Sequence, residues 1–135
     1  MSQENVELVR MGCEAWERGD MEAWLETLHP DVVWDTTHFE GRLEGAVYQG
    51  RDAVRRFAVD EWRATWDRYD SRAEQIVEAG DRVLVFWSQN MVGAGAGVPV
   101  QLDSTQVCDV RDGRVVRIDN YTDRAEALKA VGLEE

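Results

Sequence analysis

Two side chains near the end of a predicted strand, Asp35 and His38, could transfer protons. Abstraction of a proton next to a carbonyl needs a positioned base, often a carboxylate in a dry pocket, and a donor that stabilises the enolate. Both residues follow the apolar run 32–34 and are expected beside the mouth that this strand forms. They are the acid–base candidates of the chain, although the sequence identifies a partner for neither.

The same segment contains side chains from which a metal site could be imagined. The potential ligands are Asp35, His38 and Glu40, in a chain that has two histidines and two cysteines in all. A metal site needs several such ligands that converge. We therefore expect a solvated loop here, and we expect neither a metal ion nor a cofactor.

Three amide side chains of the second half are predicted to face an interior. Because side chains alternate along a strand, Gln89 lies on the face of Trp87, and Gln106 lies on the face of Cys108. Asn120 extends the apolar face of the last strand in the same way. A buried amide must be hydrogen-bonded, and a cavity that holds ligand or water can provide the partner. The alternative for each amide is an ordinary polar position at a strand end or a dimer contact.

Six tryptophans are unusual in a chain of 135 residues. Tryptophan fills space poorly when its indole N–H lacks a partner, but it suits the wall of a pocket. We predict that Trp34, Trp62 and Trp87 contact a flat, apolar ligand, and His38 is a further candidate for ligand binding. Packing within the core is the alternative for these residues, and it is the expectation for Trp24.

Nucleophilic and phosphate-binding sites are disfavoured by their sequence context. Cys108 would need a histidine neighbour to act as a nucleophile, and Ser104 lacks the strand–turn–helix context of a serine nucleophile. Cys108 is instead predicted to be a small buried hydrophobe, and both it and Cys13 are expected to be reduced. The glycine segment 93–97 lacks the Gly-Lys-Ser/Thr ending of a phosphate loop, so it is predicted to form the tip of a hairpin.

Charge and composition limit the partners of this protein. Acidic residues number 27 against 15 basic ones, which gives a formal charge of -12. Such a field repels phosphate backbones and anionic lipid, so we expect no binding to nucleic acid or membrane. The longest apolar run, 83–87, is far shorter than the roughly 20 residues of a membrane span. Without the features of a signal peptide at its start, the chain is expected to be cytoplasmic, with a single domain over residues 1–135.

Helices are predicted at the beginning of the chain. Apolar residues recur at three- and four-residue steps from Val6 to Trp16, which predicts an amphipathic helix that stops at Gly19. Asp20 can cap a second helix, and Pro30 lies just beyond the end of that helix. These two helices each present one apolar face.

The next segment combines short strands with a third helix. Strands are predicted at 32–34 and, within a loop over 38–50, at 46–48. The third helix opens at Arg51, and its apolar stripe is predicted to continue as far as Trp66.

The second half changes to the two-residue period of strands. Strands are predicted at 73–78, 82–92, 100–111 and 114–121. Asp112-Gly113 is the typical pair of a type I′ hairpin turn, and a last short helix is expected to begin near Asp123. Helices followed by antiparallel strands indicate an α+β fold, in which a curved sheet encloses a concave space against the helices.

Several segments of this chain resemble the SnoaL-like branch of the nuclear transport factor 2-like superfamily. The segments are SQENVELVR (2–10), HPDVVWD (29–35), VYQGRDAVRRF (47–57), EAGDRVLVF (78–86) and VRDGRVVRIDNYTDRAEALKAVGL (110–133). The resemblance implies an α+β cone, in which N-terminal helices wrap a curved, mostly antiparallel sheet around a deep cavity. It also implies a homodimer. The superfamily includes polyketide cyclases, steroid isomerases, dehydratases, epoxide hydrolases and non-catalytic binding or transport proteins.

The last strand departs from the cyclases that the chain resembles. Those cyclases carry an acid at the position that matches Asn120, and an asparagine cannot act as a base. Asp119 is adjacent, but strand parity places it on the opposite face with Arg117.

We expect a protein that binds a small, largely apolar molecule of polyketide- or steroid-like type in its cone. Acid–base activity of the cyclase or isomerase type is left open. The alternative is a non-catalytic, dimeric ligand-binding or interaction module. A sheet face with outward residues such as Thr105 and Val107 supports the dimer in either case.

Overall fold

The computed structural model describes residues 2–38, 47–93, 95 and 97–133. Four α-helices are found within these ranges: α1 (Ser2–Glu17), α2 (Met21–Glu26), α3 (Arg51–Arg55) and α4 (Arg124–Ala130). No described helix is both long enough and apolar enough to cross a membrane.

The first two helices form as their sequence signals predict. Val9, Cys13 and Trp16 make the buried stripe of α1. Gly19 follows with a φ of 79°, a left-handed conformation that a glycine adopts without steric cost. The carboxylate of Asp20 then caps α2, since its Oδ1 accepts a hydrogen bond of 3.1 Å from the backbone N–H of Ala23.

The third helix is wound differently from the prediction. After α3 the chain continues as the π-helical segment η1 (Arg56–Trp62) and the 3₁₀ turn η2 (Arg63–Thr65). The expected extension of the helical stripe to Trp66 is wrong, because Trp66 has extended backbone angles and pairs with Gly93 in the sheet. The wider π-helical turns reposition the side chains that follow Arg55, including that of Trp62.

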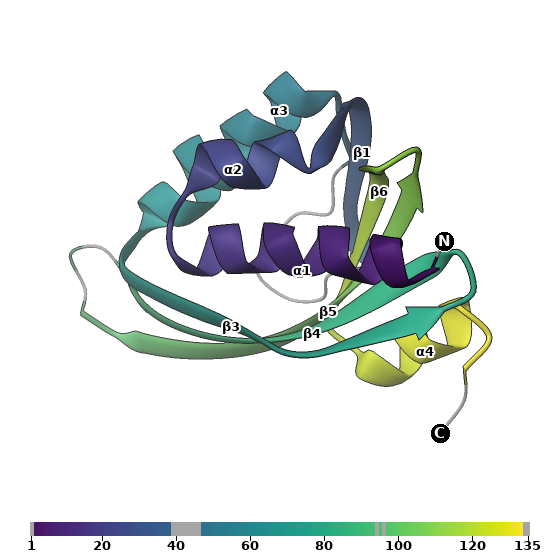
Figure 1. The fold of residues 1–135 in the computed structure, drawn as a ribbon. Helices are drawn as coiled ribbons and strands as arrows, with labels where there is room; N and C mark the ends of the chain where they lie inside the picture. Colours follow the sequence, from purple (N-terminus) through teal and green to yellow (C-terminus); the bar gives the residue numbers. More distant parts are fainter. Residues whose placement is uncertain (1, 39–46, 94, 96, 134–135) are drawn as a thin grey trace.

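The described residues form six strands in one sheet, in the order β2-β1-β6-β5-β4-β3. Their bounds are β1 (Leu28–His38), β2 (Val47–Gln49), β3 (Trp66–Ala79), β4 (Arg82–Gly93), β5 (Pro99–Arg111) and β6 (Arg114–Tyr121). Only β1 and β6 pair in parallel, and all other neighbours are antiparallel. The α+β class with a curved, mostly antiparallel sheet is therefore confirmed (Figure 1).

Two strands are much longer than their sequence patterns indicated. β1 begins at Leu28 and contains Pro30, which lies where the register against β6 is irregular, between Leu28 and Val33. A proline fits there because it has no N–H to donate to a regular ladder. β3 begins seven residues before the predicted strand 73–78. The hairpin turn at Asp112-Gly113 is confirmed by positive φ values of 52° and 75°.

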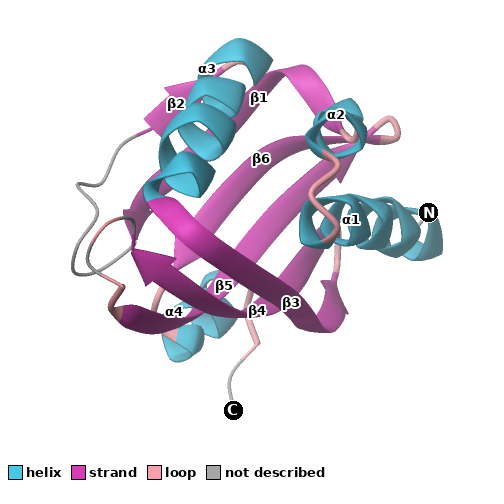
Figure 2. Cartoon of the chain, turned by 90° about the vertical axis from the view of Figure 1, so that its left-hand side faces the viewer, coloured by secondary structure: helices cyan, strands magenta, loops and turns pink. Residues whose placement is uncertain are grey.

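The two faces of the sheet carry separate apolar clusters. Helices α1, α2 and α3 lie on one side of the sheet and α4 lies on the other (Figure 1, Figure 2). The larger cluster joins the helical side to inward residues such as Val85 and Ile118. The smaller cluster packs Leu128 of α4 against outward residues that include Val107. Val107 and Thr105 are thus buried within one chain, so they do not form the exposed face that the dimer argument assumed.

A bulge determines which residues of β6 face inward. Cys108 pairs with Ile118, but Val110 pairs with Val115. Val116 is therefore the extra residue that bulges out of β6. Val115 rather than Val116 is therefore buried in the core, contrary to the predicted alternation. The bulge precedes Ile118, so the inward and outward orientations predicted for Ile118 and the residues after it are unchanged.

Candidate ligand cavity

A partly open cavity lies between the helices and the concave face of the sheet. The centres of water-sized molecules can occupy about 50 Å³ of it. A single water needs about 10–15 Å³ on this measure, so the cavity can hold more than one water. Its lining comes from most elements of the fold: Trp16, Trp24, Trp34, Phe57, Trp62, Tyr69, Trp87, Gln89, Ser104, Gln106 and Asn120.

One wall of the cavity is a chain of aromatic rings in edge-to-face contact. Trp24 lies between Trp16 and Trp34, with ring centroids 4.8 Å and 6.0 Å away. Trp34 in turn contacts Phe57 at 5.4 Å. Edge-to-face pairs of this kind contribute beyond simple burial and limit the rotation of each ring. The wall is therefore apolar and firmly packed.

A second part of the lining, the polar wall, holds polar side chains that bond to one another. The Tyr69 hydroxyl accepts a 3.1 Å hydrogen bond from Trp16 Nε1 and donates to Gln89 Oε1. Gln89 Nε2 then donates to Ser104 Oγ over 3.3 Å. The next pair along the sheet joins the indole N–H of Trp87 to Gln106 Oε1 at 2.9 Å. These bonds hold the side chains in place across α1 and three adjacent strands.

Tyr69 is the one titratable side chain among the described residues that line the cavity. Burial raises the pKa of its phenol, and hydrogen bonds from Trp62 and Trp16 together with the charge of Arg63 lower that pKa by less. The Arg63 guanidinium lies 4.7 Å from the ring centroids of both Trp16 and Tyr69. Because its pKa is raised, Tyr69 is neutral at physiological pH and acts there as a hydrogen-bond donor.

Most of the residues predicted from the sequence to bind ligand line this cavity. They are Trp34, Trp62, Trp87, Gln89, Gln106 and Asn120. Binding itself stays a prediction for each of them. Trp24 also lines the cavity, in addition to the core role that was expected for it.

Sequence reasoning missed Tyr69, which connects the polar wall to α1. The residue was left out because the strand was predicted to begin only at Ala73. The signal that could have revealed it is alternation, since Tyr69, Ser71 and Ala73 are half-buried while Asp70 and the other residues between them are exposed.

Asp35 and His38 lie outside the cavity, on the opposite face of the sheet from Trp34. Asp35 Oδ2 accepts a 2.9 Å hydrogen bond from Arg117 Nη2, and the same nitrogen donates to Asp119 Oδ1 at 3.0 Å. His38 stacks on Tyr121, with ring centroids 4.5 Å apart. The expectation that Asp35 and His38 stand at the cavity, as an acid–base pair and with His38 as a ligand contact, is therefore not met by this geometry. Strand alternation turns Asp35 away from the cavity, and a register irregularity between Asp35 and His38 places His38 beside Tyr121.

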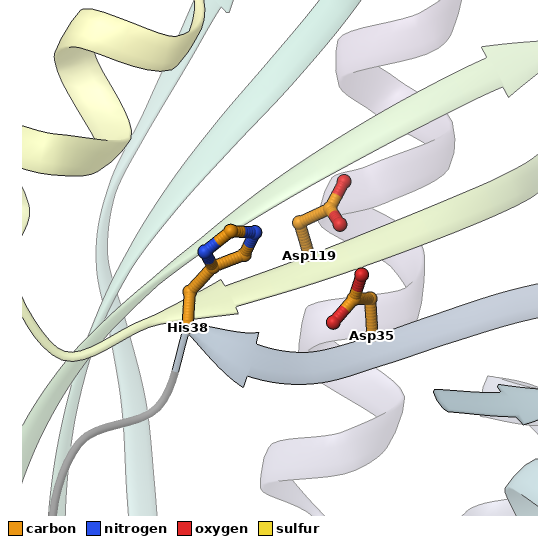
Figure 3. Close-up of side chains that lie close together, drawn as sticks. All are labelled: Asp35, His38 and Asp119. Atoms are coloured by element: carbon orange, nitrogen blue, oxygen red, sulfur yellow. The ribbon is translucent and has the colours of Figure 1, made fainter. Parts of the chain in front are cut away.

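The outer cluster of Asp35, His38 and Asp119 has the donor atoms of a metal site but is already neutralised in part. One donor atom from each residue lies within 4.8 Å of the others (Figure 3). The Arg117 guanidinium bonds to both carboxylates, so a cation would have to displace it. Asp35 is also buried in a strand rather than placed in the solvated loop that was predicted. Glu40, the third ligand imagined from the sequence, lies outside the described residues.

The charge state of Asp35 follows from its partners. Burial raises the pKa of its carboxyl, but hydrogen bonds from the Thr37 hydroxyl and backbone N–H and the charge of Arg117 outweigh burial. The pKa of Asp35 therefore lies below its usual value. A carboxylate held in this way is a poor base, which fits a structural role in joining β1 to β6.

Asn120 faces inward and Asp119 faces outward, as strand parity predicted. Asn120 lines the cavity, whereas Asp119 bonds to Arg117 on the other face. The predicted orientations hold because the bulge lies at Val116, before both residues. The side chain at the cavity end of the last strand is thus an amide and not a carboxylate.

Comparison with known families identifies the chain. A family model described as the SnoaL-like domain matches residues 9–118. The chain belongs to the SnoaL-like family. No functionally curated protein matches the sequence of this SnoaL-like chain.

Solved structures support the same fold. A nuclear transport factor 2-like protein of unknown function from Burkholderia pseudomallei is 24% identical, with a TM-score of 0.76 over 96% of this chain and 98% of that chain. A candidate polyketide cyclase from Xanthomonas campestris is 29% identical, with a TM-score of 0.68 over 97% and 98% of the two chains. A hypothetical protein with a ketosteroid isomerase-like fold from Catenulispora acidiphila, solved in complex with trimethylamine, is 18% identical, with a TM-score of 0.72 over 94% of this chain and 93% of that chain.

Proposed function

We propose that this SnoaL-like protein binds a compact, largely apolar small molecule in the cavity. The observation that carries the proposal is the composition of the lining. Aromatic rings make up most of the lining, and a small set of uncharged polar groups makes up the rest. Pockets that recognise small molecules commonly combine an apolar lining with a few fixed polar groups.

The size of the cavity favours a ligand of one or two rings. The space open to water-sized centres is about 50 Å³, and its aromatic wall is packed edge to face. A larger polyketide- or steroid-like molecule would need several of these rings to move. We therefore favour a compact aromatic or alicyclic ligand over a polyketide- or steroid-like molecule.

Binding without proton transfer is favoured over cyclase- or isomerase-type catalysis. Among the described lining residues there is no carboxylate, histidine, lysine or arginine, so no described group there can serve as a base at neutral pH. Catalysis remains the second candidate for one reason. The Tyr69 hydroxyl, which donates its one proton to Gln89 in this structure, could donate that proton to a substrate carbonyl if the Gln89 side chain moved aside.

A fluorescence titration tests the binding proposal. 1-Tetralone, a two-ring ketone, should quench tryptophan emission and reach saturation at one molecule per chain, since it would contact Trp34 and Trp87. The variant Ser104→Phe should abolish this saturation, because Ser104 is buried at the cavity and the larger side chain would fill it. The neighbouring variant Asp103→Phe is the matched control, since Asp103 is exposed on β5. Unsaturable quenching, or equal saturation in Ser104→Phe with its circular dichroism unchanged, contradicts the proposal.

We further propose a cytoplasmic homodimer, as the family resemblance suggests. Four large hydrophobic residues are the most exposed in the described part of the chain: Met11 on α1, Val47 on β2, Val98 just before β5 and Leu133 after α4. Sedimentation velocity at micromolar concentration should give twice the chain mass of 15.4 kDa. A monomer mass under those conditions rejects the dimer.

A further inference from the structure

Two polar atoms of cavity-lining residues have no hydrogen-bond partner. They are the indole Nε1 of Trp34 and the amide Oδ1 of Asn120, both unpartnered within the described part of the chain. Their residues are 4% and 9% exposed. Buried polar atoms are paired in the great majority of cases, and an unpaired one is destabilising. These two atoms therefore need an explanation.

The contrast with the rest of the cavity makes the two atoms informative. The side chains of Tyr69, Gln89 and Ser104 bond to one another, and Gln106 bonds to Trp87. The fold thus provides partners for these polar side chains, while among the fully buried atoms of the described lining residues it leaves one donor and one acceptor without a partner. Neither atom is exposed to a water-sized molecule in this structure, so a ligand that carries the complementary pair reaches them by displacing the side chains that cover them.

The positions of the two residues allow one molecule to reach both. Trp34 on β1 lies opposite Ile118 on β6, and these strands are hydrogen-bonded neighbours. Asn120 follows Ile118 by two residues, which is about 7 Å along a strand and returns to the same face. Both side chains therefore line the same cavity from adjacent strands.

We propose that the ligand is a compact hydroxy-carbonyl compound. Its carbonyl oxygen accepts a hydrogen bond from Trp34 Nε1, and its hydroxyl group donates a hydrogen bond to Asn120 Oδ1. The aromatic wall contacts the apolar frame of the same molecule. This inference rests on the proposed binding function and adds the ligand class and the two residues that select it.

A set of three one-ring ligands separates the two hydrogen bonds. 4-Hydroxyacetophenone carries both groups, 4-ethylphenol lacks the carbonyl, and acetophenone lacks the hydroxyl. Calorimetric titration of the unmodified protein should show the tightest binding for 4-hydroxyacetophenone. Each missing group should weaken binding by roughly 3- to 10-fold, the range expected for one net hydrogen bond.

Two variants assign each bond to its residue. Trp34→Phe should bind 4-hydroxyacetophenone and 4-ethylphenol equally well but still discriminate against acetophenone. Asn120→Leu should show the reverse pattern and lose only the preference for the hydroxyl group. If each variant weakens all three ligands by the same factor, the residues only shape the cavity and the inference is wrong.

Stability of the ligand-free protein provides a second readout. Asn120→Leu removes an unpaired acceptor, so its thermal midpoint should equal or exceed that of the unmodified protein. The matched control is Gln89→Leu in the same cavity, which removes partners from Tyr69 and Ser104 and should lower the midpoint. An equal decrease in both variants would make Asn120 a structural residue and overturn the inference.

The same titrations separate this inference from the binding proposal beneath it. Equal affinity of the unmodified protein for all three ligands contradicts the hydroxy-carbonyl class and leaves binding of apolar molecules intact. Absence of binding by all three, together with no saturation by 1-tetralone, contradicts both.

Discussion

At the scale of single residues, Arg117 is the connection between β1 and β6 on the outer face. Its guanidinium bonds to Asp35 and Asp119, whose side chains are 12% and 16% exposed. Removal of the cation leaves two carboxylates close together and partly buried, which is destabilising. The effect should be larger than that of an exposed ion pair.

Arg117→Met is expected to lower the free energy of unfolding by about 1–2 kcal/mol at pH 7. The control is Arg68→Met, which breaks a 3.9 Å pair with Asp70 whose side chains are 77% and 75% exposed. That change should have an effect of less than about 0.5 kcal/mol. Urea denaturation measures both, and equal effects would show that the Arg117 contacts contribute no more than a surface pair.

Asp35 predicts a pH dependence of stability. Because its pKa in the folded protein is below the usual value, its carboxylate stabilises the fold above the pKa of the unfolded chain, about 3.9. This contribution is lost as the pH falls through the lower folded pKa. Asp35→Asn should therefore destabilise the protein at pH 7, and the difference from the unmodified protein should shrink below about pH 4. A difference that stays constant from pH 7 to pH 3 would contradict this account.

The two cysteines are predicted to be unreactive in the native protein. Both are buried and free. Burial raises the pKa of the Cys13 thiol to about 12, and it raises that of Cys108 still further. Since the thiolate is the reactive form, a thiol reagent at pH 8 should label neither residue until the protein is unfolded. Rapid labelling of one thiol without denaturant would show that its site is open.

At the scale of elements, the sequence predicts those parts of the fold whose signals are local. The glycine and aspartate that separate α1 from α2, and the Asp112-Gly113 turn, depend on backbone preferences of a few residues. The early start of β3 depends instead on pairing with the end of β4, where Trp66 meets Gly93. Such long-range pairing overrides the helical spacing that led to the wrong boundary.

The candidate site was predictable to the extent that side chains alternate regularly between the two faces of each strand. Alternation placed Gln89, Gln106 and Asn120 at the cavity, and the bulge at Val116 did not disturb them. The same rule, applied to Asp35 beside the inward Trp34, would have turned Asp35 outward. The arrangement of free and bonded polar atoms could not be predicted, because it depends on distances between α1 and strands far apart in the sequence.

Helix α4 is predicted to stabilise the outer face of the sheet. Leu128 is buried against Leu84 and Phe86, and Asp123 caps the helix. Leu128→Ala should lower the free energy of unfolding by about 2–4 kcal/mol, because it leaves a cavity in this cluster. Leu133→Ala, which truncates a more exposed leucine just after the helix, should change it by less than about 0.5 kcal/mol. Comparable effects in denaturant titrations would contradict the assigned packing.

At the scale of the whole molecule, the fold separates two kinds of site. The helical side of the sheet encloses an uncharged cavity, while the outer side carries α4 and the charged contacts of Asp35, Arg117 and Asp119. The formal charge of -12 is therefore kept away from the cavity lining. Under the proposed function, a ligand that enters would exchange water for aromatic rings and a few neutral hydrogen-bonding groups.

The most direct test of cavity binding is calorimetric titration with 1-tetralone at two temperatures. We predict saturable binding of one molecule per chain and a negative heat-capacity change, the mark of apolar surface removed from water. Binding should be absent in Ser104→Phe and retained in Asp103→Phe. No saturable heat with the unmodified protein, or the same binding isotherm with Ser104→Phe, would contradict the assignment of this cavity as the ligand site.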